Sequence, residues 1–177
     1  MKGLVEDLLF LAKSDAAQLT AEQTAVELDQ VVTGALLPFE SVAFESGVTL
    51  TDHLTPGLIV LGDQGQLRRL VVILLDNGVK YAGHGGEVTV ILERLGDQPR
   101  LTVHNSGPAI PAQHLPHLFE RFYRADPSRN SKQGGHGLGL AIAHSIVQRH
   151  GGTITVTSAE EVGTTFTVLF PKIGKKR

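Results

Sequence analysis

A run of glycines leads directly into a predicted helix near the end of the chain. Gly134, Gly135, Gly137 and Gly139 stand at or just before the apolar segment 140–143. A helix start presents unpaired backbone N–H groups and the positive end of the helix dipole, and glycines let the backbone approach an anion because they carry no Cβ. The pattern favours phosphate binding, although it is neither a P-loop nor a G-x-G-x-x-G dinucleotide turn. Taken alone, the pattern is better explained as a glycine linker that caps an ordinary helix.

A second set of polar residues ends the strongly apolar segment 70–81. Asn77, Lys80 and Tyr81 fall within about one helical turn, so Asn77 can share a face with Lys80 or Tyr81. An amide oxygen suits Mg²⁺, which takes one or two protein oxygens beside waters and substrate phosphates. An ammonium group suits phosphate, and a tyrosine ring offers a flat apolar wall. The alternatives are a helix-ending asparagine, a solvated lysine and a tyrosine at the rim of the core.

A long polar segment, 106–136, separates these two patterns, and loops of that length inside a compact domain are usually functional. Its second half carries more basic than acidic residues in a chain whose net charge is −2. That excess fits a lid that closes on polyphosphate, with the aromatic residues of the segment as a hinge or an anchor. Arg129 and Lys132 are explained as ordinary solvated residues.

Five segments taken together resemble the N, G1, F, G2 and G3 boxes of the sensor histidine kinase catalytic domain, in the superfamily that includes gyrase, Hsp90 and MutL. In chain order they are 70–81, 103–111, 118–124, 134–143 and 163–166. The resemblance spans roughly residues 20–171 and implies an α+β fold of the Bergerat type: a two-layer sandwich in which three helices cover one face of a mixed β-sheet.

The resemblance also implies ATP and Mg²⁺ as ligands. It gives Asn77, Lys80 and Arg124 catalytic roles, with Asn77 as the metal ligand. The nucleotide contacts that it implies are Asn77, Lys80, Tyr81, Asn105, Gly107, Ala109, Ile110, Phe119, Arg124, Gly135, His136, Gly137, Leu138, Gly139, Leu140 and Thr164.

The chain departs from the family pattern at several of these boxes. Asn105 stands where an aspartate usually accepts the adenine amine, and Ala109 replaces a glycine. An amide oxygen still accepts a hydrogen bond, worth roughly 1 kcal/mol less without charge assistance, and its NH₂ group can turn toward a guanine carbonyl instead. Ile73 replaces the glutamate that activates water in gyrase-type relatives, which favours phosphotransfer over hydrolysis. His136 replaces a serine or threonine, and Glu161 replaces a glycine.

Composition limits the remaining possibilities. With 177 residues, 41% of them hydrophobic and 19% charged, the chain suits one globular domain. A net charge of −2 provides no strong field for nucleic acid, so we expect no nucleic-acid partner. The absence of cysteine excludes disulfides and thiolate metal sites.

The hydrophobic pattern predicts the elements that position these residues. Residues 1–15 form an amphipathic helix, either the tail of the second helix of a dimerisation and phosphoacceptor hairpin, as the resemblance implies, or a capping helix of the same domain. We therefore divide the chain into 1–18 and a catalytic domain, 19–177, with an ATP lid at about 111–136. The other predicted helices are 29–45 with Asp29 as N-cap, a helix after Gly62-Asp63, and 137–149. The predicted strands are 24–28, 48–50, 58–61, 88–92, 101–103, 153–157 and 164–170.

The predicted function is the ATP-binding catalytic domain of a bacterial two-component sensor histidine kinase. None of the eight histidines has the context of the family's acceptor, which lies in a helix before an acidic residue and near a proline. The acceptor is therefore expected on a hairpin absent from this chain. The expected partners are ATP, that hairpin and a response regulator. The full-length protein is expected to be a homodimer anchored in the inner membrane, with this domain cytoplasmic and monomeric or weakly dimeric by itself. The alternatives are an anti-sigma-type serine kinase and a degenerate nucleotide-binding or docking module.

Overall fold

The structure is a computed structural model that describes residues 2–16, 23–125 and 136–174. Its elements are α1 (Lys2–Asp15), β1 (Thr24–Glu27), α2 (Leu28–Glu45), β2 (Thr49–Leu54), β3 (Ile59–Gly62), α3 (Gln64–Ala82), β4 (Glu87–Leu95), β5 (Gln98–Asn105), the 3₁₀ turn η1 (Leu115–His117), α4 (Gly139–Arg149), β6 (Thr153–Ala159) and β7 (Gly163–Leu169).

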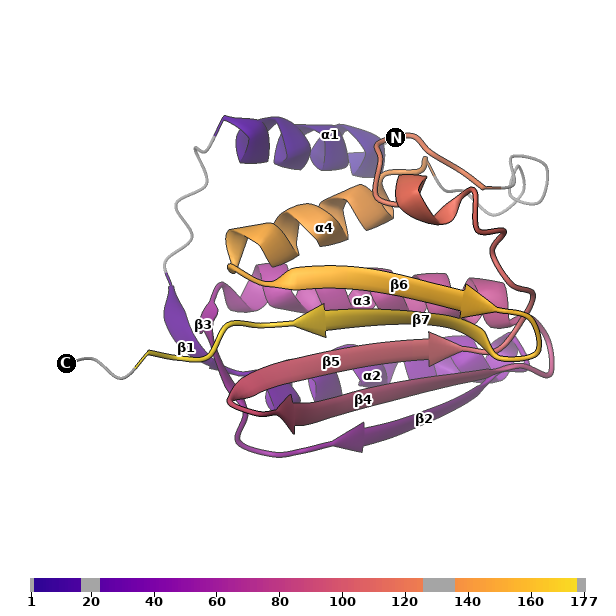
Figure 1. Ribbon diagram of the computed structural model, residues 1–177, viewed down its shortest axis with the longest axis horizontal. Helices are drawn as coiled ribbons and strands as arrows, with labels where there is room; N and C mark the ends of the chain where they lie inside the picture. The colour runs from indigo at the N-terminus through magenta and orange to yellow at the C-terminus, as the bar shows by residue number, and fades with distance from the viewer. Residues whose placement is uncertain (1, 17–22, 126–135, 175–177) are drawn as a thin grey trace.

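Five strands form one mixed sheet in the order β2-β4-β5-β7-β6, and β1 and β3 form a separate antiparallel pair. In the larger sheet β2 runs parallel to β4, and the other neighbours are antiparallel. Helices α2, α3 and α4 cover one face of this sheet (Figure 1). The predicted two-layer α+β sandwich is therefore confirmed.

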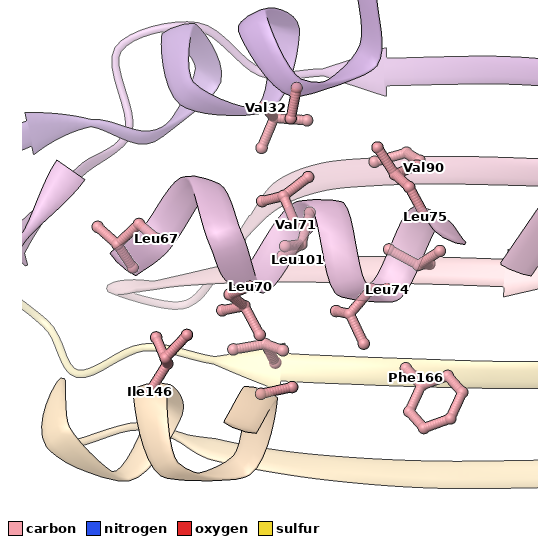
Figure 2. Close-up of a cluster of buried hydrophobic side chains, with 14 of the residues drawn as sticks. Val32, Leu67, Leu70, Val71, Leu74, Leu75, Val90, Leu101, Ile146 and Phe166 are labelled. Atoms are coloured by element: carbon pink, nitrogen blue, oxygen red, sulfur yellow. The ribbon is translucent and has the colours of Figure 1, made fainter. Parts of the chain in front are cut away.

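The core lies between the sheet and its helices, with α3 at its centre. Alternate residues of β4 and β5 are buried, as the two-residue period of a half-covered sheet requires. Figure 2 shows side chains of α3, among them Leu70 and Leu74, between Val32 of α2, Ile146 of α4 and Phe166 of β7. This packing fixes α3 against the sheet and so fixes the polar residues at its C-terminal end.

Helix α3 has the boundaries that its capping residues predict. The Asp63 carboxylate accepts a hydrogen bond from the Gln66 N–H at 2.9 Å, and the helix ends before Gly83, whose φ of +69° favours glycine. The imidazole of His150, buried at the end of α4, accepts a hydrogen bond from the Asp63 N–H. The start of α3 is therefore tied to the end of α4.

Several predicted boundaries were wrong for tertiary reasons. Helix α2 begins at Leu28 with Glu27 as its N-cap, because the Asp29 carboxylate accepts a hydrogen bond from the Gly57 N–H at 3.2 Å instead of capping the helix. Strand β2 continues to Leu54, because the polar residues after Leu50 pair with β4. Helix α4 begins at Gly139 rather than Gly137, whose φ of +71° is not helical. The pairing of β1 with β3 outside the main sheet was not predicted.

Helix α1 lies on α4, away from the sheet (Figure 1). Leu11 is 2% exposed in this contact, while Val5 and Leu9 remain more than half exposed. Asp7 forms an ion pair with Arg69, whose guanidinium also lies 4.7 Å from the centre of the Phe10 ring. The helix therefore has one apolar side on the domain and a second apolar side in solvent. Among the described residues, no helix combines the length and apolar character needed to cross a membrane.

Candidate functional site

A cavity of about 300 Å³ lies beside the C-terminal half of α3, where the two patterns of the sequence meet. Residues from α3, from the segment before the undescribed residues 126–135 and from the start of α4 form most of its wall. The lining residues are Asp7, Ile73, Asp76, Asn77, Lys80, Tyr81, Ile110, Leu118, Tyr123, Arg124, Ala125, His136, Gly137, Leu138, Gly139, Leu140 and Phe166.

Helix α3 presents one face to this cavity, and most of its side chains there are polar. Ile73, Asn77 and Lys80 recur at helical spacing, together with Asp76, so they share a face. The Lys80 ammonium lies 2.9 Å from the Asp76 carboxylate, one turn earlier. Both side chains are partly exposed, so this pair contributes little and leaves Lys80 able to contact a ligand. The sequence prediction omitted Asp76, although a carboxylate four residues before a lysine on a helix is the spacing that favours an ion pair.

The N-terminus of α4 also faces the cavity. Its N-cap residue is Leu138, which makes no side-chain cap, and residues from Gly137 to Leu140 line the wall. Within the described part of the chain, the N-cap residue therefore supplies no side chain to the first N–H groups of the helix. An anion in the cavity would accept hydrogen bonds from them and interact favourably with the helix dipole.

The first part of the predicted lid, residues 111–125, is anchored rather than loose; we call it the lid base. Successive backbone hydrogen bonds of the 3₁₀ type, such as His114 N–H to Pro111 and His117 N–H to His114, coil the segment tightly. The Phe119 ring stacks on His144 of α4 at 5.5 Å between ring centres. The remaining lid residues of the prediction, including Gly135, lie outside the described residues, except His136.

Arg124 brings a positive charge with an unused donor to the cavity wall. Its Nη2 atom is buried and has no hydrogen-bond partner among the described residues. A buried guanidinium N–H without an acceptor costs roughly 1–3 kcal/mol or more. A phosphate in the cavity would supply that acceptor, so the residues present fit an anionic ligand.

Five predicted contact residues do not line the cavity: Asn105, Gly107, Ala109, Phe119 and Thr164. Asn105 is 2% exposed at the end of β5, and its Nδ2 donates to the Ser106 carbonyl at 2.8 Å. Gly107 has a φ of +124°, and a Cβ there would clash with the Tyr81 carbonyl. The turn after β5 is therefore packed tightly against the end of α3, behind the residues that line the cavity.

Thr164 acts on the wall through a residue that the sequence did not indicate. Its hydroxyl lies 2.8 Å from the Ser158 hydroxyl, which in turn accepts the Ile110 N–H at 2.9 Å. Ile110 lines the cavity. Strands β6 and β7 therefore hold the backbone of Ile110 in place. The cross-strand partnership of Ser158 and Thr164 is visible only once the register is known.

The described ranges contain no cluster of three or more acidic or histidine side chains that could hold a metal ion. The side chain of Asn77 is the cavity-lining oxygen donor that the sequence predicts for Mg²⁺. A Mg²⁺ ion that takes one protein oxygen and completes its shell with phosphates and waters fits this donor set.

Comparison with known proteins places this geometry in a family context. The model of the family described as "Histidine kinase-, DNA gyrase B-, and HSP90-like ATPase" matches residues 62–174. The chain is similar to sensor histidine kinase CusS of Escherichia coli O6:H1, with 40% identity over 171 residues that cover 97% of this chain and 35% of CusS. Its similarity to sensor histidine kinase YkoH of Bacillus subtilis is 38% identity over 170 residues, 96% of this chain and 36% of YkoH. The chain thus spans about a third of the length of these relatives.

Solved structures agree with the sequence comparison. The mycobacterial sensor histidine kinase MprB superposes with a TM-score of 0.71 at 32% identity, over 84% of this chain and 97% of that chain. Full-length ShkA, in a structure with AMPPNP, superposes with a TM-score of 0.83 at 25% identity, over 96% of this chain and 35% of ShkA.

Proposed function

The chain belongs to the histidine kinase-, DNA gyrase B- and HSP90-like ATPase family, as an ATP-binding catalytic domain of the sensor histidine kinase type, and we propose that it phosphorylates a histidine on a hairpin outside this chain. The observation that carries the proposal is the convergence on one cavity of Lys80, the Arg124 Nη2 atom and the start of α4, the last two without a side-chain partner among the described residues. All three are complementary to a polyphosphate.

In the proposed reaction a nitrogen of the acceptor histidine attacks the γ-phosphorus of ATP, the bond from that phosphorus to the bridging oxygen breaks, and ADP leaves. The N–H groups at the start of α4 hold the phosphate chain, and Lys80 and Arg124 neutralise it. Asn77 would hold Mg²⁺, which draws charge from the phosphate oxygens when bound. The contributions of this chain are therefore positioning and charge stabilisation.

We propose that adenine lies near Asn105, at the end of β5. Because Asn105 is 2% exposed and does not line the cavity, the base would reach its side chain only when the turn at 106–109 moves. Because Nδ2 of this residue already donates to the Ser106 carbonyl, the Oδ1 atom is left as acceptor. An acceptor there suits the adenine amine and repels the guanine carbonyl. This orientation argues against the weaker discrimination against GTP that the sequence alone suggests.

We propose further that α1 is the end of a dimerisation hairpin helix. Its apolar side chains Val5, Leu8 and Leu9 are exposed on the side away from the domain, where a partner helix would cover them. The full-length protein would be a membrane-anchored homodimer with this domain in the cytoplasm, acting on a response regulator; ThkA, another histidine kinase, has been solved with response regulator TrrA. The anti-sigma-type kinase and the docking module are not favoured, since the relatives are named sensor histidine kinases.

Phosphotransfer in trans tests this function. The chain is mixed with a purified phosphoacceptor hairpin of a sensor histidine kinase and γ-labelled Mg-ATP, and the stability of protein-bound label is measured in acid and base. We expect acid-labile, base-stable label on the hairpin, and loss of that label with Arg124→Ala. Label on the chain itself, or acid-stable label on serine, would contradict the proposal.

A further inference from the structure

Two histidines and a tyrosine gather in the lid base, outside the roles assigned so far. The His114 Nδ1 atom is hydrogen-bonded to the Tyr123 hydroxyl. The His117 ring lies 5.4 Å from the Tyr123 ring, and its Nδ1 lies 2.7 Å from a Glu120 carboxylate oxygen. We propose that His114 is a positioning residue for the terminal phosphate: through Tyr123 it fixes the backbone that carries Arg124 to the cavity.

The bond between His114 and Tyr123 closes the lid base into a ring. The two residues are nine positions apart. Backbone hydrogen bonds already link them in three steps, from His117 to His114, from Glu120 to His117 and from Tyr123 to Glu120, and the side-chain bond ties the two ends of this series directly. Phe119, within the ring, is held by His144 and by Phe166, whose ring centre lies 6.2 Å from that of Phe119. One side of the ring is thus attached to the domain, and the bond to Tyr123 fixes the other side.

The last residues of the ring, directly before Arg124, need this support. Phe122 has a φ of +64°, a left-handed conformation that is unfavourable for a residue with a side chain. Its N–H donates to the Gly137 carbonyl at 2.9 Å, and Tyr123 follows directly. When the bond from His114 to Tyr123 is lost, one of the contacts that hold this strained turn is lost too. The turn can then relax, and Arg124 shifts with it.

The charges that line the cavity suggest why binding of the terminal phosphate is sensitive to the position of Arg124. Lys80 is already paired with Asp76 at 2.9 Å, whereas Arg124 Nη2 has no partner within the described ranges. Asp7 adds a further carboxylate to the wall. Lys80 can also contact a phosphate, but Arg124 brings a buried donor that lacks an acceptor among the described residues, so the position of Arg124 affects recognition of the terminal phosphate. This step rests on the proposed function, in which Arg124 contacts that phosphate.

A double-mutant cycle in which the affinities for two nucleotides are measured tests the inference. Dissociation constants for Mg-ATP and Mg-ADP are measured by calorimetry for the wild-type chain, His114→Ala, Tyr123→Phe and the double variant. Tyr123→Phe removes only the hydroxyl oxygen and keeps the ring packed, so it remains informative if His114→Ala folds poorly. His53→Ala, on the outward side of β2, is the control.

Each single variant should weaken Mg-ATP by about fivefold and Mg-ADP by less than about twofold, the loss expected for one hydrogen bond that acts on one phosphate. The double variant should be no weaker than either single one, because both remove the same bond. Additive losses, or equal losses for ATP and ADP, would show that His114 merely stabilises the fold. If the wild-type chain binds neither nucleotide, the proposed function fails and this inference fails with it.

Discussion

Glu161 occupies a backbone conformation suited to glycine, and its replacement should stabilise the protein. It lies in the loop between β6 and β7 with a φ of +63°, and its side chain is exposed. A left-handed conformation costs a residue with a Cβ roughly 1–2 kcal/mol, and glycine avoids that cost. Glycine also increases the conformational entropy of the unfolded chain, which lowers the free energy of unfolding by roughly 0.5–1 kcal/mol. Glu161→Gly should therefore raise the free energy of unfolding by about 0.5–1 kcal/mol.

The measurement is thermal and urea unfolding of three proteins: wild type, Glu161→Gly and Glu161→Ala. A gain of 1 kcal/mol raises the Tm of a domain of this size by roughly 2–4 °C, so the glycine variant should melt about 1–4 °C higher. The alanine variant removes the carboxylate but keeps the Cβ, so its Tm should stay near that of wild type. Equal shifts in both variants, or no gain with glycine, would refute the backbone argument.

Two further substitutions test the packing and the base site. Gly62→Ala should destabilise the fold by about 1–3 kcal/mol, because the added Cβ would overlap the His150 ring, which its hydrogen bonds to the Asp63 N–H and the Ile146 carbonyl hold in place. Urea unfolding checks this, with Gly34→Ala as a control for the glycine-to-alanine change at a site that has open space and a φ outside the left-handed region. Asn105→Asp should tighten ATP binding by at most about tenfold through charge assistance, without improving GTP. Calorimetry with both nucleotides checks this, and equal affinities of the two proteins for ATP would show that Asn105 does not read the base.

The parts of the fold that local chemistry determines could be predicted from the sequence. Helix α3 is one such element, because the Asp63 cap, the spacing of its leucines and Gly83 act within a few residues. The same holds for the glycines that lead into α4. Since α3 and residues 136–140, which lead into and begin α4, carry most of the cavity wall, the core of the candidate site followed from these two segments.

The rest depends on contacts between residues distant in sequence. The Asp29 carboxylate hydrogen-bonds to Gly57, so the sequence signal of a capping residue was wrong there. Ser158 reaches Ile110 only through the register of β6 with β7, and Asp7 reaches the cavity only because α1 packs on α4. Such contacts have no periodic signature, so composition and spacing do not reveal them.

Calorimetric titration with ATP, in the presence and absence of Mg²⁺, tests the central claim that this cavity is a Mg-ATP site. The wild-type chain should bind ATP more tightly with Mg²⁺, and Asn77→Ala should lose most of that difference because it removes the oxygen ligand of the ion. Gln148→Ala, which removes an exposed amide from α4, should behave as wild type. No binding at millimolar Mg-ATP, or an undiminished effect of Mg²⁺ in Asn77→Ala, would contradict the account.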